Sequence, residues 1–262
     1  MSKTLTIVGI GASAGGIQAL EQFFQNLPDN LGMAYIIVMH LAPDRKSNLD
    51  EILQKKTKMT VKPVIEGTKV KPNHVYLIPP NRDLDIKNHT LYLSEFDPYQ
   101  KLRLPIDHFF RSLAQQYKKD AIGVLLSGTG SDGTLGLREI KGLGGISIVQ
   151  NPETASYQEM LSNAIKHVDV DIILSPSQIA NKLAQYKDNI HKIPKLEKSS
   201  KNIDMENYLN EIYGIIHNTT GYDLSGYRKT TIGRRIEKRM SVNQIYEIEK
   251  YLEFLQEHHE EN

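Results

Sequence analysis

The sequence predicts an α/β fold with a three-layer, doubly wound and mostly parallel sheet, followed by a small all-α domain. Over the first two thirds of the chain, short runs rich in Val, Ile and Leu alternate with segments of helical apolar spacing. This alternation is typical of parallel strands joined by crossover helices. From about residue 202 the strand patterns stop, and apolar residues recur only at helical spacing. The 262 residues suffice for one large domain or two unequal ones.

Six apolar runs are expected to form the buried strands of the sheet. They are Leu5–Ile10, Ala34–Met39, His74–Ile78, Ala121–Leu126, Gly145–Val149 and Asp171–Leu174. Helices are expected at Ile17–Leu27, Ser47–Gln54, Ile106–Tyr117, Leu135–Leu143, Ser156–Ile165 and Ser177–Tyr186. The segment Leu84–Ser94 alternates apolar and polar residues on both sides of a polar turn at Asn88, which predicts an antiparallel hairpin at one edge of the sheet.

A polar, Lys-rich stretch after Tyr186 contains Pro194 and a Ser-Ser pair and has no sustained apolar period. It predicts a linker at residues 189–203, between an α/β domain at 1–188 and a helical domain at 204–262. A helical unit of about 60 residues is near the lower limit for independent stability. We therefore expect it to pack on a segment further along a longer chain.

The composition excludes several classes of protein. The 32 Lys and Arg balance 31 Asp and Glu, which argues against a protein that binds nucleic acid with its whole surface. The absence of cysteine excludes disulfides, thiolate nucleophiles and cysteine zinc sites, and it suits a reducing cytoplasm. No signal peptide and no run of about 18 apolar residues is present. We expect a soluble, cytoplasmic protein without a metal site.

Ser13 lies on the predicted turn that follows the first strand. The run GASAGG at residues 11–16 leads from this strand into a helix, and its small residues leave room for a substrate at an exposed serine. The backbone amides of Ala14 and Gly15 are candidate donors to an oxyanion. Two other interpretations stay open. Residues 9–14 also fit the GxGxxA pattern of a phosphate or dinucleotide site, and the glycines also fit a turn with a structural role alone.

His40 ends the second predicted strand, where a dinucleotide fold has an acidic residue instead. The carboxyl ends of parallel strands meet at one edge of a sheet, so His40 is placed to take the proton of Ser13 as a general base. A surface histidine is the alternative.

Asp132 follows the predicted strand Ala121–Leu126, in the segment SGTGSDGT, and so reaches the same edge. A carboxylate there can orient an imidazole and stabilise its charged form. The alternative is a helix cap or an Asx turn, because Asp-Gly is common in turns.

The order Ser13, His40, Asp132 differs from that of α/β-hydrolases. The blocks GIGASAGGIQAL, VMHLAP, VYLIPPNRDL, LLSGTGSDGTLGL and ISIVQNPETASYQEMLSNAI together resemble the CheB chemotaxis protein-glutamate methylesterase domain, over about residues 3–186. The resemblance implies that Ser13 is the nucleophile, His40 the base and Asp132 its support.

The resemblance also implies an activity: hydrolysis of glutamate γ-methyl esters on the cytoplasmic helices of chemoreceptors, with release of methanol, and often deamidation of glutamines. Such a reaction needs no metal or cofactor. The partner is then a methylated receptor helix or a similar coiled coil, with no nucleic acid and no insertion into a membrane. Two alternatives stay open: a catalytically silent module that binds or scaffolds receptor-like helices, and a dinucleotide-binding oxidoreductase.

Two departures from the family pattern bear on activity. The catalytic strand begins almost at Met1, so the phosphorylatable receiver domain that usually precedes it is expected to be absent. Thr129 stands where the family commonly has methionine, and the block around Met160 lacks the usual glycine and proline.

The segment IIHNTTGYDLSGYRKTTIGRRIEKRM resembles the amino-terminal helical domain of CheR protein-glutamate methyltransferases, from about Asp204 to the end. The chain is therefore expected to be the front part of a CheB–CheR fusion. S-adenosylmethionine would be required only by a methyltransferase domain further along. Basic residues predict a helix face that docks on acidic receptor helices, with a solvated surface as the alternative. The candidates for partner binding are Arg228, Arg234, Arg235 and Arg239.

Overall fold

The computed structural model describes residues 5–39, 48–95, 103–189, 203–222, 226 and 229–258. It divides into two compact units, Met1–Ala184 and Gln185–Asn262.

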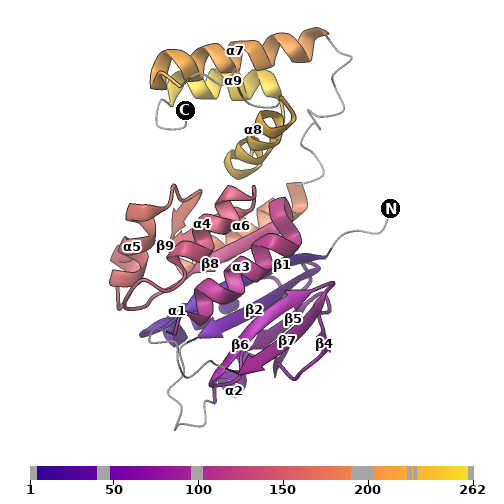
Figure 1. Cartoon of the computed structure of the whole chain (residues 1–262), viewed down its shortest axis with the longest axis vertical. Coiled ribbons are helices and arrows are strands. Elements are labelled where there is room, and N and C mark those ends of the chain that lie inside the picture. Colours follow the sequence, from indigo (N-terminus) through magenta and orange to yellow (C-terminus); the bar gives the residue numbers. More distant parts are fainter. Residues whose placement is uncertain are drawn as a thin grey trace. The chain divides into compact units, whose positions relative to one another are not determined.

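Seven parallel strands form the central sheet of the first unit (Figure 1). Their order is β10-β9-β8-β1-β2-β5-β3. The strands are β1 (Thr6–Ala12), β2 (Met33–Met39), β3 (Thr60–Pro63), β5 (His74–Leu77), β8 (Ala121–Leu125), β9 (Ile146–Gln150) and β10 (Ile172–Leu174). Because β1 lies between β2 and β8, the strand order reverses at β1. In open α/β sheets, the carboxyl ends at such a reversal are where ligands bind.

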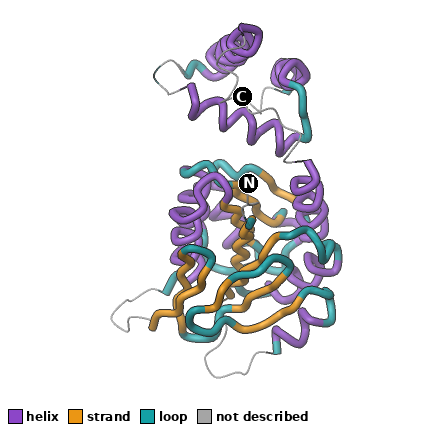
Figure 2. Tube along the Cα trace, turned by 90° about the vertical axis from the view of Figure 1, so that its right-hand side faces the viewer, coloured by secondary structure: helices purple, strands orange, loops and turns teal. Residues whose placement is uncertain are grey.

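Helices lie on both sides of these strands (Figure 2). They are α1 (Gly16–Gln25), α2 (Leu49–Gln54), α3 (Pro105–Tyr117), α4 (Thr134–Gly142), α5 (Glu159–His167) and α6 (Pro176–Asn189). Helix α1 packs its two phenylalanines against one face of β2, where Phe23 and Phe24 contact the ring of Tyr35 edge to face at centroid distances of 6.3 and 5.9 Å. The fold class predicted from the sequence is confirmed.

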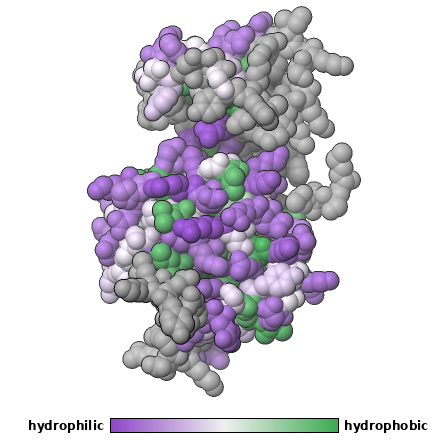
Figure 3. Space-filling view, in the orientation of Figure 1, coloured by the Kyte–Doolittle hydropathy of each residue, from purple (hydrophilic) through white to green (hydrophobic). Residues whose placement is uncertain are grey.

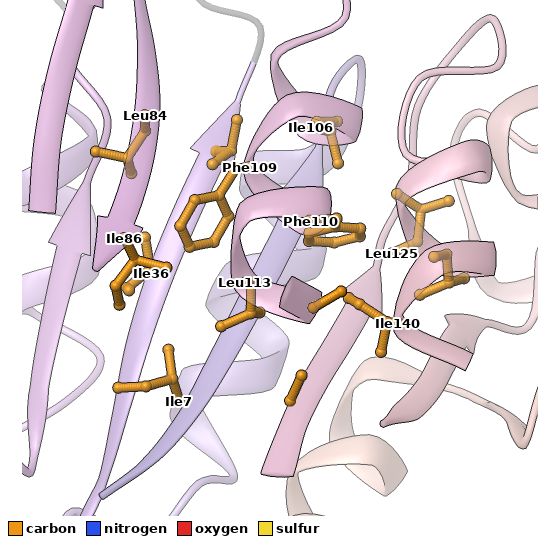
Figure 4. Packing of buried hydrophobic residues seen from close by; sticks show 14 of the residues in the cluster. Ile7, Ile36, Leu84, Ile86, Ile106, Phe109, Phe110, Leu113, Leu125 and Ile140 are labelled. Carbon is orange, nitrogen blue, oxygen red and sulfur yellow. The ribbon is translucent and has the colours of Figure 1, made fainter. Parts of the chain in front are cut away.

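Helix α3 packs on the opposite face of the sheet and contributes two fully buried phenylalanines to the core. Figure 4 shows Phe109, Phe110 and Leu113 of this helix among apolar residues of the strands. Glycine in β1 allows the close approach, since a Cβ on Gly9 would lie 2.9 Å from Leu113 Cδ2 and 3.0 Å from Phe109 Cε1. Gly11 also faces α3, through Ile106.

The predicted hairpin is confirmed, but it forms a sheet of its own rather than an edge of the parallel one. Strands β6 (Arg82–Lys87) and β7 (Thr90–Glu95) pair antiparallel, and β7 also pairs with the short strand β4 (Thr68–Lys69). Asn88 and His89 both have positive φ, 48° and 59°, as a two-residue hairpin turn of right-handed twist requires. This small sheet covers α3, because Ile86 N donates to Ser112 Oγ at 2.9 Å.

The second unit contains only helices among its described residues: α7 (Ile203–Thr220), α8 (Lys229–Asn243) and α9 (Ile248–Glu257). Their shared core consists of Ile212, Ile232, Ile236, Met240, Ile248, Tyr251 and Leu255.

Hydrophilic residues cover most of the face of the described chain drawn in Figure 3, with small hydrophobic patches between them. Among the helices of the described residues, none is long and apolar enough to cross a membrane.

Candidate active site

Ser13 follows β1 directly and begins a tight turn. The turn closes when Gly16 N donates to Ser13 O at 2.9 Å, and Gly15 takes the left-handed φ of 72° that favours glycine. Ser13 is 8% exposed, and its N–H donates to Ser127 O at 3.0 Å. Within the described part of the chain, the N–H groups of Ala14 and Gly15 have no hydrogen-bond partner. They are therefore available to an oxygen atom of a bound molecule.

The glycines of the GxGxxA pattern have a packing role. Gly9 and Gly11 both lie inside β1 and face α3, where a Cβ would collide with core side chains. In a dinucleotide site, by contrast, such glycines lie in the turn and face the pyrophosphate. The geometry thus favours the serine interpretation of this segment over the dinucleotide one.

Ser127 joins three loops around Ser13, and sequence reasoning missed it. Its Oγ donates to Ala14 O at 2.9 Å and accepts from Tyr157 N at 3.1 Å, while its N–H donates to Gln150 Oε1 at 2.9 Å. Ser127 and Gln150 are each only 1% exposed. The available signal was the position of each residue at the end of a buried strand, where a polar side chain needs a partner.

Gly128 lets α5 pack behind the serine. A Cβ on Gly128 would lie 2.8 Å from Met160 Sδ and 3.0 Å from Ser13 Cβ. Met160 is fully buried and its N–H donates to Gly128 O at 3.1 Å. The block that departs from the family pattern around Met160 therefore forms a wall beneath Ser13, whereas Thr129 is exposed.

Asp132 is 2% exposed and caps a helix, but not the helix that it precedes. Its Oδ2 accepts from Ile106 N at 3.0 Å and its Oδ1 accepts from Asp107 N at 2.9 Å, both in the first turn of α3. The cap residue of α4 itself is Gly133, with φ 91° and no side-chain bond. The alternative interpretation of Asp132 as a helix cap therefore holds for α3 and not for the helix that Asp132 precedes. The role as an active-site carboxylate stays a prediction.

Asp107 completes a reciprocal arrangement that the sequence did not reveal. This carboxyl group is 2% exposed, and its Oδ1 accepts from Gly136 N, in the first turn of α4, at 2.7 Å. Each helix therefore has N-terminal N–H groups bound to a carboxylate from the other helix or its loop. Helix N-termini favour negative charge, so both contacts are electrostatically favourable.

Both buried carboxyl groups have a raised pKa. Burial raises the pKa of Asp132 to about 7, the negative charge of Asp107 adds to the rise, and the N–H groups of α3 oppose it. Burial also raises the pKa of Asp107, while the N–H of Gly136 and the charge of Arg111 oppose that rise. A buried carboxyl group with such a raised pKa, at the carboxyl edge of a parallel sheet, is a candidate for a functional site.

His40 lies outside the described residues, so its geometry stays a prediction. The strand that leads to it ends at Met39, which pairs in register with Ala12, the residue before Ser13. The loops of Ser13 and Asp132 are also tied together, since Leu126 N donates to Gly11 O at 2.9 Å. The structure thus brings Ser13 and Asp132 to one edge of the sheet.

A cleft of about 200 Å³ opens beside the Ser13 turn, and it is lined by Gly15 of this turn and not by Ser13 itself. Gln18 and Gln22 of α1 line one wall, the segment from Glu153 to Ser156 lines the other, and Ser127 belongs to the cleft as well. Two large apolar side chains are exposed near Ser13 and Asp132: Tyr157, in the loop before α5, is 49% exposed, and Leu135, in the first turn of α4, is 43% exposed. Polar and apolar surface side by side suits a protein segment better than a small ion.

The predicted basic face of the second unit can be followed at two positions. Arg235 is exposed on α8, and Arg239, one turn further, is half-buried. Arg228 lies outside the described residues, and Arg234 lies on α8 with its side chain outside the description. Docking of a partner on this face stays a prediction.

Comparisons with known proteins agree on one family. Residues 8–183 match the family model of the CheB methylesterase, and residues 207–262 match that of the all-alpha domain of the CheR methyltransferase. The chain is 37% identical over 172 residues to a Leptospira interrogans protein named as a candidate protein-glutamate methylesterase/protein-glutamine glutaminase, covering 65% of this chain and 89% of that protein. It is 32% identical over 181 residues to a Pectobacterium atrosepticum protein-glutamate methylesterase/protein-glutamine glutaminase, covering 68% of this chain and 51% of the relative.

A solved structure is similar over the same region. The crystal structure of the Thermotoga maritima CheB methylesterase catalytic domain superposes with a TM-score of 0.64 at 31% identity. The match covers 69% of this chain and 98% of that domain. Because the family model covers residues 8–183 and the solved catalytic domain is similar over 69% of the chain at 31% identity, the chain belongs to the CheB methylesterase family.

Proposed function

We propose that this chain is a serine hydrolase that removes methyl groups from glutamate γ-methyl esters of proteins, releases methanol, and also deamidates glutamine side chains. The observation that carries the proposal is the Ser13 turn, which holds a serine at the carboxyl edge of the sheet beside two unpartnered N–H groups. The names of the relatives, protein-glutamate methylesterase/protein-glutamine glutaminase, support the same chemistry.

In the proposed reaction, Ser13 Oγ attacks the ester carbonyl while His40 takes its proton. The N–H groups of Ala14 and Gly15 stabilise the oxyanion that forms. The bond to the methoxy group then breaks, and His40 returns the proton so that methanol leaves. Water, activated by His40, finally attacks the glutamyl-serine ester and restores Ser13.

Asp132 orients His40 and stabilises its protonated form in this proposal. That role requires the ionised carboxylate, and burial works against ionisation because it raises the pKa of Asp132 to about 7. The two N–H groups of α3 oppose the effect of burial. Burial and the N–H groups therefore act in opposite directions on the ionisation of Asp132, which would occur within the pH range in which the enzyme would work.

The proposed substrate is a cytoplasmic helix of a chemoreceptor, or a similar coiled coil, reached in the cytoplasm. The cleft beside Ser13 would take polar side chains of such a helix, and Tyr157 and Leu135 would cover its apolar residues. Arg235 and Arg239 of the second unit would add attraction to acidic helices. The proposed reaction uses no metal or cofactor.

Incubation of the chain with a methyl-labelled coiled-coil receptor fragment tests the proposal. We expect labelled methanol to be released with time, and ammonia to be released from a fragment with glutamine at the methylated positions. The substrate control is a methyl-labelled peptide of the same composition in scrambled order, which cannot form the coiled coil. Binding of the fragment without either product would favour a silent scaffold module and contradict the proposed hydrolase.

A further inference from the structure

We propose that Asp107, in the first turn of α3, is a positioning residue of the active site, which fixes the loop of Asp132 and tunes the charge of that carboxylate. The inference rests on the proposed hydrolase function, and it adds a residue to that site. Asp107 is 25 positions before Asp132 in the chain, so no local pattern links the two.

The first step of the argument is the reciprocal contact between α3 and α4. Asp132 receives the N–H groups of Ile106 and Asp107, and Asp107 receives the N–H of Gly136 at 2.7 Å. Neither cap residue, Leu104 or Gly133, supplies a side-chain bond to its own helix. Each helix start thus depends on a carboxylate supplied from the other side of the contact.

The second step is the close packing that holds this contact in one geometry. A Cβ on Gly136 would lie 3.0 Å from both Cα and O of Asp107, so only glycine allows the two helices to approach this far. Both carboxyl groups are 2% exposed. Water therefore cannot replace a lost oxygen of Asp107, and the start of α4 would shift together with the loop of Asp132.

The third step is electrostatic. The positive charge of Arg111 acts on Asp107, and the negative charge of Asp107 acts on Asp132. Backbone N–H groups also act on the pair, among them those of Ile106 and Asp107 on Asp132 and that of Gly136 on Asp107. Loss of the charge at Asp107 therefore removes a repulsion and makes Asp132 easier to ionise.

The test separates charge from position with two substitutions. Asp107→Asn keeps an oxygen for the N–H of Gly136 but removes the charge. We expect the acid limb of its kcat/KM profile to move to lower pH by about half to one unit, with kcat at the optimum within about threefold of wild type. Asp107→Ala removes the oxygen as well. We expect it to lower kcat about tenfold or more, with KM within about twofold.

The matched control is Asp171→Asn. Asp171 is another buried carboxylate, but its Oδ2 accepts a hydrogen bond from Ser147 N at the start of β9. This contact lies at the amino edge of the sheet, away from the carboxyl edge that holds Ser13 and Asp132. We expect this control to lower the melting temperature without moving the pH profile. A profile of Asp107→Asn that superimposes on that of wild type, or moves to higher pH, overturns the inference. Because Asn preserves the acceptor, this outcome does not depend on whether the alanine variant folds.

A second measurement keeps the inference apart from the proposed function. The carboxyl carbon of Asp132 can be titrated by NMR in the full chain, wild type and Asp107→Asn, with no substrate present. We expect the midpoint of Asp132 to fall by about half a unit or more in the variant. An unchanged midpoint contradicts the inference even in an active enzyme, and a lowered midpoint supports the charge coupling even in an inactive one.

Discussion

Ser127 is the residue whose substitution tests most sharply how the loops hold the nucleophile. Ser127→Ala removes one hydroxyl group and adds no atom, so it creates no clash. The hydroxyl donates to Ala14 O at 2.9 Å and accepts from Tyr157 N at 3.1 Å. Two backbone groups, Ala14 O and Tyr157 N, therefore lose this partner.

The magnitude follows from the exposure of these two groups. Loss of a partner costs a buried polar group about 1 to 3 kcal/mol, and the lower value applies here because Ala14 is half-buried and Tyr157 is 49% exposed. The free energy of unfolding of the first unit should fall by about 2 kcal/mol. At a typical urea dependence, this loss lowers the midpoint of unfolding by about 1 M.

The same substitution should also lower the catalytic rate, because Ala14 and Gly15 carry the proposed oxyanion donors. We expect kcat to fall about tenfold, because a displacement well below 1 Å at the reacting centre is costly. Urea unfolding followed by circular dichroism and methanol release are the two assays. Ser94→Ala, at an exposed serine on β7, is the matched control. A midpoint and a kcat that both equal those of this control would refute the reasoning.

Two further outcomes follow from contacts away from the Ser13 turn. Asp171→Ala should lower the free energy of unfolding by about 2 to 3 kcal/mol, measured by urea unfolding, because the buried Ser147 N and Oγ lose the acceptor Asp171 Oδ2, at 2.9 and 2.8 Å. Lys141 Nζ loses Asp171 Oδ1 at 2.6 Å but keeps Asp169 Oδ2 at 3.1 Å, so no unpaired charge is left. A loss below about 1 kcal/mol would contradict this. The bond between His108 and Asp85, at 3.0 Å, raises the pKa of His108 and lowers the pKa of Asp85. The raised His108 contributes stability that is present at low pH and lost as pH rises through its folded value, while the lowered Asp85 contributes stability that is lost as pH falls through its folded value. His108→Gln should therefore be less stable than wild type mainly between about pH 4 and 6.5, by at most about 1 kcal/mol because both side chains are partly exposed; a difference of equal size at pH 9 would contradict the assignment.

The parallel sheet was predictable because each of its main strands is a continuous apolar run. Thr60–Pro63 and Thr68–Lys69 were missed because they are short and contain no buried residue, so no apolar period marks them as strands. The hairpin was predictable from its alternation and its turn. Its assignment to a separate sheet was not, because that depends on pairing with Thr68–Lys69, some twenty residues away. The local sequence pattern thus predicts that a segment is a strand, but the sheet that the strand joins depends on pairing with residues distant in the chain.

The candidate site divides in the same way. Ser13 and Asp132 could be found because each follows a buried strand at the carboxyl edge, where the topology itself brings them together. Asp107 and Ser127 could not, because their roles arise from contacts between segments 25 or more residues apart. The glycine-rich pattern at residues 9–14 also suggested a dinucleotide site, whereas Gly9 and Gly11 allow α3 to pack closely on β1. Glycines in a sequence do not reveal whether a ligand or a core side chain lies opposite them.

The most direct test of the central claim is the initial rate of methanol release from a methylated receptor helix by wild type, Ser13→Ala and the control Ser94→Ala. If Ser13 Oγ is the nucleophile, the Ser13→Ala rate should fall about 10⁴-fold or more, while the control keeps the wild-type rate and both variants keep the wild-type midpoint of unfolding. A Ser13→Ala variant that releases methanol within about tenfold of the wild-type rate would contradict the assignment of Ser13 as the nucleophile.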